Sequence, residues 1–378
     1  MKPYFGAFVL MACGLISGCF LFKSSHHLKD QKIKIAFVGS LTGDTASFSK
    51  NTLKGIELAL KEAKKDGIQI ELIVKNNGGN PETAVHNMNE LVTDNNIMAI
   101  LGEVSSGMSL TIAPIAQRAQ IPMITPTSTN PRVTEVGDYI FRICFIDPFQ
   151  GYVMAKFARE HLKVDKVAVL KDRKSDYSKG LASFFTKTFE DLSGHIVMDE
   201  VYNTGDRDFK IQLEQIRKTQ PEAVFLPGYY RDVALIARQA RIMGIQAYFL
   251  GGDGWDSDQL FEIGREAVNG SYFSNHFTVE SNNENVQQFV KAYRETYHLN
   301  PDGLSARGYD ATNILITAMK NTKELTRKSL RDELAKINNF PGATGNTSIN
   351  SHRNAKKPAV VLKVEGPANR YITTIAPE

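Results

Sequence analysis

The sequence predicts an α/β protein of two lobes, each built on a doubly wound parallel sheet, with a hinge between them. At 378 residues the chain is too long for one ordinary hydrophobic core, so two lobes are expected. Short apolar segments rich in β-branched residues alternate with longer segments of helical periodicity. This alternation, which is typical of parallel sheets covered by helices, begins a second time after residue 165.

The first half of the mature chain reads as strand, helix, strand from residue 32 onward. Leu53, Ile56 and Leu60 fall on one helical face, and Asn80 followed by Pro81 is a typical helix start. Four segments are predicted strands: 33–39, 68–76, 97–102 and 121–125. The helices between them allow these strands to run parallel.

The second half repeats the pattern and ends differently. Its predicted strands are 166–172, 195–202, 223–228 and 247–252, followed by a helical stretch over 283–336 and two short strands in the tail. We expect lobe 1 to contain residues 32–147 and 276–345, and lobe 2 to contain 148–275 and 346–378.

The N-terminus has the features of a secretory signal. Lys2 precedes an apolar run over residues 4–16, which is too short to span a bilayer comfortably. The segment "ISGC" that follows resembles a bacterial lipobox, which implies that Cys19 is acylated and becomes the first mature residue. On this interpretation residues 1–18 are the signal peptide and 19–31 a lipidated tether. We therefore expect an extracytoplasmic, membrane-anchored protein.

The cysteine count agrees with this interpretation. Cys13 leaves with the signal and Cys19 carries the lipid, so Cys144 has no partner for a disulfide. Because it lies in the apolar run "YIFRICFI", we interpret Cys144 as a buried structural thiol.

Two clusters of hydroxyl side chains follow consecutive predicted strands. They are "GEVSSGMS" at 102–109 and "ITPTSTNP" at 124–131. Surface turns are the ordinary interpretation of such residues, but doubly wound sheets bind ligands at the carboxyl ends of their strands. Ser105 and Ser106 also precede a predicted helix, and free N–H groups at a helix start favour a carboxylate or phosphate. Whether Pro114 kinks this helix or begins another is left open.

Composition and motifs argue against several classes of function. The 45 basic and 41 acidic residues are mixed along the chain, without the basic stripe expected for nucleic-acid binding. "GEVSSG" lacks the G-x-S-x-G spacing of a hydrolase, "GGDGWD" lacks that of a dinucleotide loop, and the eight His show no metal-ligand spacing. We expect no enzyme activity, no cofactor and no metal.

Several segments together resemble the branched-chain amino-acid-binding proteins of ABC importers, which share the type I periplasmic binding protein fold. They include "IAFVGSLTGDTASF", "ILGEVSSGMS", "IPMITPTSTNP", "DYSKGLA", "FLPGYYRD", "GGDGWDS" and "GYDA". The resemblance covers nearly the whole mature chain. It implies a monomer that delivers an amino acid to ABC permease subunits. Sugar-responsive repressors of the same fold carry an N-terminal DNA-binding helix pair, whose place is taken here by the signal and tether.

The resemblance assigns roles to seven residues. Ser106 matches the serine that binds the ligand carboxylate, Thr127 supplies main-chain contacts, and Thr129 supplies a hydroxyl and an amide. Asp253 matches the acid that receives the amino group, a position where the best-known members use Glu. The aromatic contacts are Tyr177, Tyr229 and Phe48. The disulfide of the family is missing, because Gly79 and Ser105 stand where its cysteines are expected.

Physical chemistry supports these residue types independently. A zwitterion that leaves water must keep both of its charges paired. Hydroxyl and amide groups can hold the carboxylate, one acid can hold the ammonium, and aromatic faces add a cation–π attraction. The ligand side chain is left open among aliphatic, aromatic and amide types, and so is the choice between import and a ligand-sensing receptor subunit. Two interpretations of Trp255 are left open, a contact on the lobe surface and a residue of the pocket. Asp147 and Gln150 fall where the chain is expected to cross between lobes, but Asp147-Pro148 is also an ordinary helix start, which is the interpretation we favour.

Overall fold

The computed structural model describes residues 28 and 31–377. Cys19 and the predicted signal peptide lie outside the described residues. Within the described part, no helix combines the length and the apolar character needed to cross a bilayer.

Lobe 1 is built on a five-stranded sheet in which all neighbouring strands are parallel, in the order β2-β1-β3-β4-β5. Its strands are β1 (Ile33–Gly39), β2 (Ile70–Asn76), β3 (Ile97–Gly102), β4 (Met123–Thr125) and β5 (Ile140–Arg142). Its helices are α2 (Ala46–Lys65), α3 (Pro81–Thr93), α4 (Ser106–Arg118), α5 (Arg132–Glu135), α11 (Glu284–Tyr297), α12 (Gly303–Asn321) and α13 (Arg327–Leu334). The four predicted strands of this half are confirmed, with two of them starting two residues later than expected.

Two local predictions are resolved in this lobe. The Asn80 side chain accepts a hydrogen bond from the Thr83 N–H at 2.7 Å, and Pro81 stands in the first turn, so α3 begins as expected. Pro114 lies inside α4, which continues past it as one helix.

Lobe 2 is built on a seven-stranded sheet in the order β15-β14-β10-β9-β8-β6-β7. Its strands are β6 (Lys166–Asp172), β7 (His195–Tyr202), β8 (Ala223–Phe225), β9 (Tyr248–Gly251), β10 (Tyr272–Asn275), β14 (Ala359–Glu365) and β15 (Ala368–Ile375). Five strands run parallel, whereas β14 and β15 add an antiparallel edge. The sheet is therefore mixed, because the tail returns as a hairpin that needs no helical crossover.

The helices of lobe 2 connect the parallel strands. They are α6 (Asp147–Lys156), its continuation η1 (Phe157–His161), α7 (Asp176–Asp191), α8 (Lys210–Thr219), α9 (Tyr230–Ile242), η2 (Asp253–Trp255), α10 (Gln259–Gly264) and η3 (Arg265–Val268). A small antiparallel sheet of β11 (Phe340–Gly342), β12 (Gly345–Ile349) and β13 (Ala355–Lys356) lies near the lobe junction and was not predicted.

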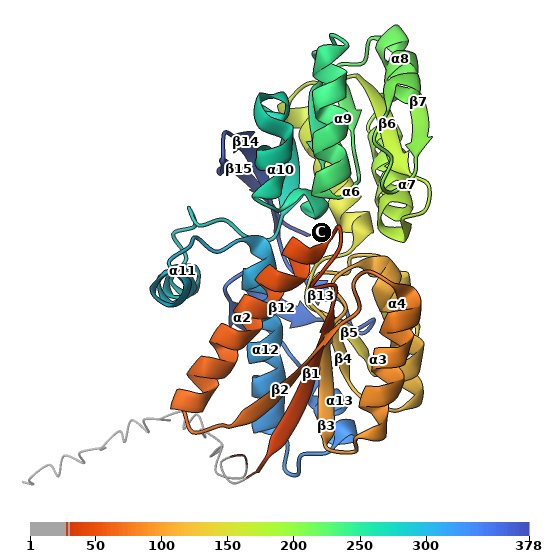
Figure 1. Ribbon diagram of the computed structural model, residues 1–378. Helices are drawn as coiled ribbons and strands as arrows, with labels where there is room; N and C mark the ends of the chain where they lie inside the picture. Colours follow the sequence, from red (N-terminus) through yellow and green to blue (C-terminus); the bar gives the residue numbers. More distant parts are fainter. Residues whose placement is uncertain (1–27, 29–30, 378) are drawn as a thin grey trace, which may run out of the picture.

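The two lobes stack end to end, with the amino ends of α2 and α12 at the junction (Figure 1). The chain crosses between the lobes after β5, after β10 and before β14. Strands β3 and β4 of one lobe and β6, β8 and β9 of the other end toward this junction. The expected ligand-binding edges of both sheets therefore face each other.

Candidate ligand-binding site

The amino end of α4 presents hydrogen-bond donors to the junction. Ser106 is the first residue of α4 and is buried, and within residues 31–377 the Ser105 side chain makes no capping bond to the helix. The Ser106 Oγ accepts the Asn130 N–H at 3.3 Å, which leaves its own proton available for donation. Free N–H groups and a hydroxyl at a helix start are the donors that a carboxylate needs.

Glu103, a buried acid that the sequence analysis did not single out, holds this loop in place. Its carboxylate accepts hydrogen bonds from the Ser105 N–H at 2.7 Å and from the Asn77 amide and Ser40 hydroxyl, both at 3.1 Å. Burial raises the pKa of Glu103, although these bonds oppose the rise. Glu103 therefore ties the residue before α4 to the loops that follow β1 and β2.

Most hydroxyls of the two clusters bind the protein itself. Thr127 lines the junction, but its hydroxyl donates to the Val104 carbonyl, so only its backbone is free to meet a ligand. The Ser128 and Ser109 hydroxyls lie 2.7 Å apart. The clusters thus tie the loops after β3 and β4 together.

Thr129 is buried but is not among the residues that line the cavity at the junction. Its carbonyl accepts the Asp147 N–H at 2.9 Å, and its hydroxyl helps to moderate the pKa of the Asp147 carboxyl. The structure therefore places Thr129 beside the first crossing between lobes, at the start of α6.

A cavity of about 20 Å³ lies between the lobes. Six of the seven predicted ligand contacts line it; its lining residues are Phe48, Val104, Ser106, Thr127, Tyr177, Tyr229, Asp253, Gly254, Leu304 and Arg307. Both lobes contribute, as a site between two sheet edges requires. A space this small holds about one water molecule, so the lobes must separate to admit an amino acid.

Three aromatic rings form walls of this cavity. Tyr177 and Tyr229 stack with their centroids 5.2 Å apart. Phe48, from the first turn of α2, meets Tyr229 edge to face at 5.6 Å. Phe48 belongs to lobe 1 and the tyrosines to lobe 2, so the aromatic contact spans the junction.

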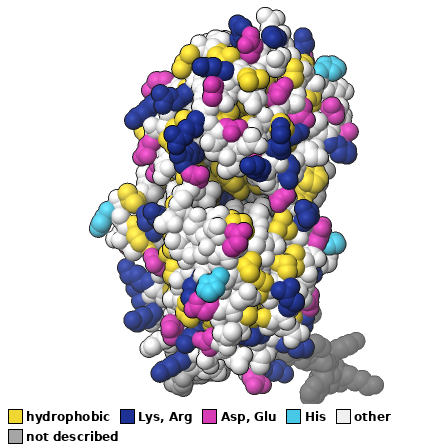
Figure 2. All heavy atoms as spheres, turned by 45° about the vertical axis from the view of Figure 1, so that its right-hand side comes forward, with side chains coloured by type: hydrophobic (Ala, Val, Ile, Leu, Met, Phe, Trp, Pro, Cys, Tyr) yellow, Lys and Arg dark blue, Asp and Glu magenta, His cyan; other side chains and the backbone are white. Residues whose placement is uncertain are grey.

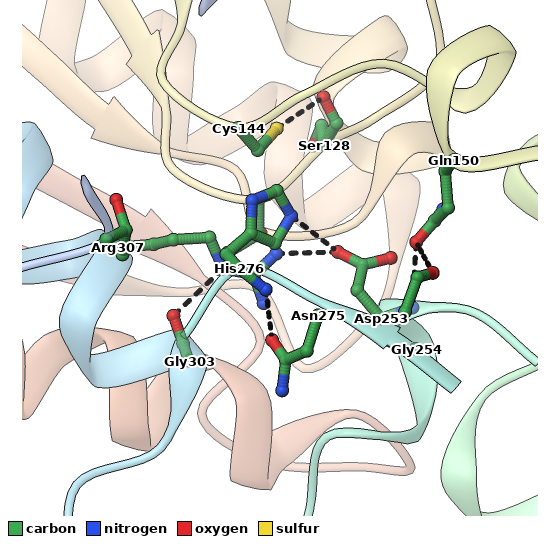
Figure 3. Close-up of polar contacts among 12 residues, drawn as sticks. Ser128, Cys144, Gln150, Asp253, Gly254, Asn275, His276, Gly303 and Arg307 are labelled. Atoms are coloured by element: carbon green, nitrogen blue, oxygen red, sulfur yellow. Dashed lines mark hydrogen bonds and ion pairs between the residues drawn. The ribbon is translucent and has the colours of Figure 1, made fainter. Parts of the chain in front are cut away.

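Asp253 is the central acid of the site and stands just beyond β9. Its Oδ1 accepts the Tyr177 hydroxyl at 3.2 Å, and its N–H donates to the Gln150 side chain at 2.9 Å. Gln150 extends from α6 at the first crossing (Figure 3). The sequence analysis placed Gln150 at the crossing without assigning it a role.

Arg307 is the main residue that the sequence analysis missed. Its Nη1 lies 2.6 Å from the Asp253 Oδ2, so α12 of lobe 1 forms a buried ion pair with lobe 2. Burial alone would raise the pKa of Asp253, but His276 and Arg307 outweigh burial and hold that pKa at about 2. The carboxylate therefore stays ionised, as an ammonium acceptor must, but it already has a cationic partner.

His276 also contacts this acid, with its Nε2 3.5 Å from the Asp253 Oδ2. The imidazole stacks on the Phe145 ring, with the two ring centroids 3.6 Å apart. Burial lowers the pKa of His276 well below its ordinary value, with the Arg307 charge acting in the same direction. His276 is therefore neutral, and Arg307 is the charged partner of Asp253.

The signal for Arg307 is present in the sequence. Arg307 shares one face of α12 with Ala311, Ile314 and Leu315, because they follow it at the helical spacings of four, seven and eight residues. All three are buried and apolar. A charged residue on such a face is rarely buried without a partner. That pattern identifies an important residue, but it does not identify the acid that pairs with it.

A larger groove of about 710 Å³ lies where α2 meets α9 and α10. It is lined by charged side chains of both signs, among them Asp44, Lys54 and Arg231. Figure 2 shows apolar side chains in the furrow at the waist of the molecule, below a gathering of Lys and Arg. The smaller cavity between the lobes fits a small ligand better than this groove, because it combines buried donors, an acid and aromatic walls.

Comparison with known proteins agrees with this geometry. The profile of the periplasmic binding protein family matches residues 32–369. The leucine-binding protein LivK of Thermotoga maritima is 37% identical and superimposes with a TM-score of 0.88 over 91% of this chain and 99% of that one. LivJ of Streptococcus pneumoniae, solved in complex with isoleucine, is 31% identical with a TM-score of 0.87, over 92% of this chain and all of that one.

A curated relative extends the comparison. The leucine-, isoleucine-, valine-, threonine- and alanine-binding protein of Pseudomonas aeruginosa is 27% identical over 339 residues, 88% of this chain and 90% of its own length. The family consists of solute-binding proteins rather than enzymes. With its two facing sheets and a cavity between them, the chain belongs to the periplasmic binding protein family, among relatives that are branched-chain amino-acid-binding proteins of ABC transporters.

Proposed function

We propose that the protein captures an α-amino acid between its lobes and delivers it to an ABC importer. The proposal rests on one observation. The cavity has hydrogen-bond donors that can hold a carboxylate on one lobe, and an ionised carboxylate that can hold an ammonium on the other. Ser106 and the start of α4 would hold the α-carboxylate, and Asp253 the α-ammonium. Both charges of a zwitterion leaving water would then be paired.

The relatives narrow the first ligands to test. Leucine, isoleucine and valine recur in their names, and one relative was solved with isoleucine. Phenylalanine is a further candidate because Phe48, Tyr177 and Tyr229 form an aromatic wall. Thr129 enters this proposal as a support of the loop rather than as a lining residue.

The proposal is tested by calorimetric titration with three leucine-shaped ligands: leucine, 3-methylbutylamine without the carboxylate, and 4-methylpentanoate without the ammonium. We expect only the amino acid to bind measurably. Ser106→Ala should weaken its binding roughly tenfold through loss of one hydrogen bond to a charged group. Ser183→Ala, an exposed hydroxyl of α7, is the control. Binding of the amine or the acid as tight as that of leucine would contradict the proposal.

Lipid anchoring through Cys19 is a second part of the proposal. It would hold the monomer at the outer face of a membrane, where it can meet permease subunits. Cys19→Ala should block processing and leave no acylated mature form. The measurement is mass spectrometry of the mature N-terminus together with fractionation, and a mutant that is normally processed and membrane-bound would refute the anchor.

A further inference from the structure

Arg307 brings a positive charge into the proposed amino-acid cavity. Its side chain is fully buried and lines the same cavity as Ser106, Asp253 and the tyrosines. Figure 3 shows it reaching from α12 toward Asp253, beneath His276. A guanidinium cannot lose its proton in a protein, so this charge is permanent.

The donors of Arg307 are only partly used. Its Nε donates to the Gly303 carbonyl at 2.9 Å, and Nη1 donates to Asp253. Nη2 is buried and has no hydrogen-bond partner among the residues that the structure describes. Asp256, another buried carboxyl nearby, makes no ion pair with Arg307 in the described chain. A buried donor without an acceptor is unfavourable, so an acceptor supplied by a ligand would stabilise Nη2.

The carboxylate oxygens of Asp253 also have only part of their hydrogen-bond-accepting capacity occupied. Oδ2 receives Arg307, and Oδ1 receives the Tyr177 hydroxyl. A carboxylate has about four acceptor sites, so Oδ1 can still accept an ammonium. The cavity therefore offers an incoming amino acid an acceptor for its ammonium and an additional unsatisfied cationic donor.

An aliphatic ligand side chain has no atom that can accept a hydrogen bond from the Nη2 of Arg307. The side chains of leucine, asparagine and aspartate all branch into two heavy atoms at Cγ, so they are close in shape. Only asparagine and aspartate bring an oxygen that can accept from a guanidinium. The three ligands therefore isolate the effect of an acceptor at nearly constant shape.

We infer that Arg307 is a specificity-determining residue that makes the cavity prefer an amino acid whose side chain ends in a carboxylate or carboxamide oxygen over an aliphatic one. This inference rests on the proposed function and narrows its substrate class. The oxygen would accept from Nη2 while the α-ammonium shares Asp253. Both members of the buried ion pair would then contact the ligand.

The test is titration of the wild-type protein with leucine, asparagine and aspartate. We expect asparagine or aspartate to bind roughly tenfold or more tightly than leucine, the gain typical of a hydrogen bond to a charged group. Comparison of the two shows whether the carboxamide or the carboxylate is the better partner. If leucine binds more tightly than both, the inference is wrong while the proposed function stands. If no α-amino acid binds, the proposed function fails and the inference fails with it.

Variants of Arg307 test the assignment to this residue. Arg307→Met should move the affinity ratio of asparagine or aspartate to leucine at least roughly tenfold toward leucine, whereas Arg307→Lys, which keeps the charge, should move it less. The ratio cancels any general loss of affinity from a weakened fold. Arg217→Met, on the exposed surface of α8, is the matched control and should leave the ratio unchanged. An unchanged ratio in Arg307→Met would overturn the inference.

Discussion

Asp147, a single buried residue at the first crossing between the lobes, makes the stability of the protein depend on pH. Neither carboxyl oxygen of Asp147 has a hydrogen-bond partner by distance and angle within the described residues. Burial raises its pKa to about 7, against about 3.9 in an unfolded chain. Between these values the folded protein keeps a proton that the unfolded chain has lost. The contribution of Asp147 to stability therefore falls as the pH rises from about 4 to 7.

Asp147→Asn should remove this penalty. At pH 8 we expect its free energy of unfolding to exceed that of the wild type by about 2–4 kcal/mol, and at pH 4 the two should nearly agree. Urea denaturation at pH 4, 6 and 8 measures the difference. Asp191→Asn, an exposed carboxylate at the end of α7, is the control and should show no such trend. A difference that is the same at all three pH values would refute the assignment.

At the scale of elements, the close packing of α2 against α12 determines where two cavity residues lie. α2 carries Phe48, and α12 carries Arg307. The helices approach closely because glycines face the partner backbone: a Cβ on Gly55 would lie 1.9 Å from the Ser305 carbonyl oxygen, and one on Gly308 would lie 2.2 Å from that of Thr52. No larger residue fits without separating the helices.

Gly308→Ala should therefore destabilise the protein and disturb the cavity together. Overpacking of this kind costs about 1–3 kcal/mol in the free energy of unfolding, and the affinity for the amino acid should fall as Phe48 and Arg307 move. Thermal unfolding and titration measure the two effects. Gly107→Ala, at a helical glycine of α4 with nothing within 4 Å of the added Cβ, is the control for stability and should leave the free energy of unfolding unchanged. Equal stability of Gly308→Ala and the wild type would contradict the packing argument.

At the scale of the whole molecule, the structure shows the lobes closed on each other. The Tyr230 hydroxyl donates to the Asp44 carbonyl at 2.8 Å, and the Asn130 amide donates to the Asp176 carbonyl at 3.0 Å. Arg307 and Asp253 add an ion pair between the lobes. Because the cavity is smaller than an amino acid, entry requires these contacts to open.

We expect the protein without ligand to populate a more open arrangement that closes about the three crossings, which lie after β5, after β10 and before β14. Small-angle scattering should show a smaller radius of gyration with a saturating amino acid than without it. The amine that lacks the α-carboxylate serves as a control and should leave the radius unchanged. No change with an amino acid that calorimetry shows to bind would argue against closure.

The sequence by itself determined most of the fold, because it depends on local signals. Alternating strand and helix periods, the Asn80-Pro81 start of α3 and the doubling of the pattern after residue 165 all act over short segments. The antiparallel edge of lobe 2 and the small sheet of β11–β13 escaped prediction, since pairing between strands is not written in the period of either strand.

The ligand-binding site was likewise predictable from the sequence only in part. Residue types at strand ends, together with the resemblance, placed Ser106, Thr127, Asp253 and the aromatic rings of both lobes at one cavity. Only the tertiary structure decided which donors are already bound: the Thr127 hydroxyl is taken by Val104, and Asp253 is paired with Arg307. Residues 253 and 307 belong to different lobes, and their charges interact only once the chain has folded. Hydrogen-bond satisfaction is a property of distances, which a sequence pattern does not contain.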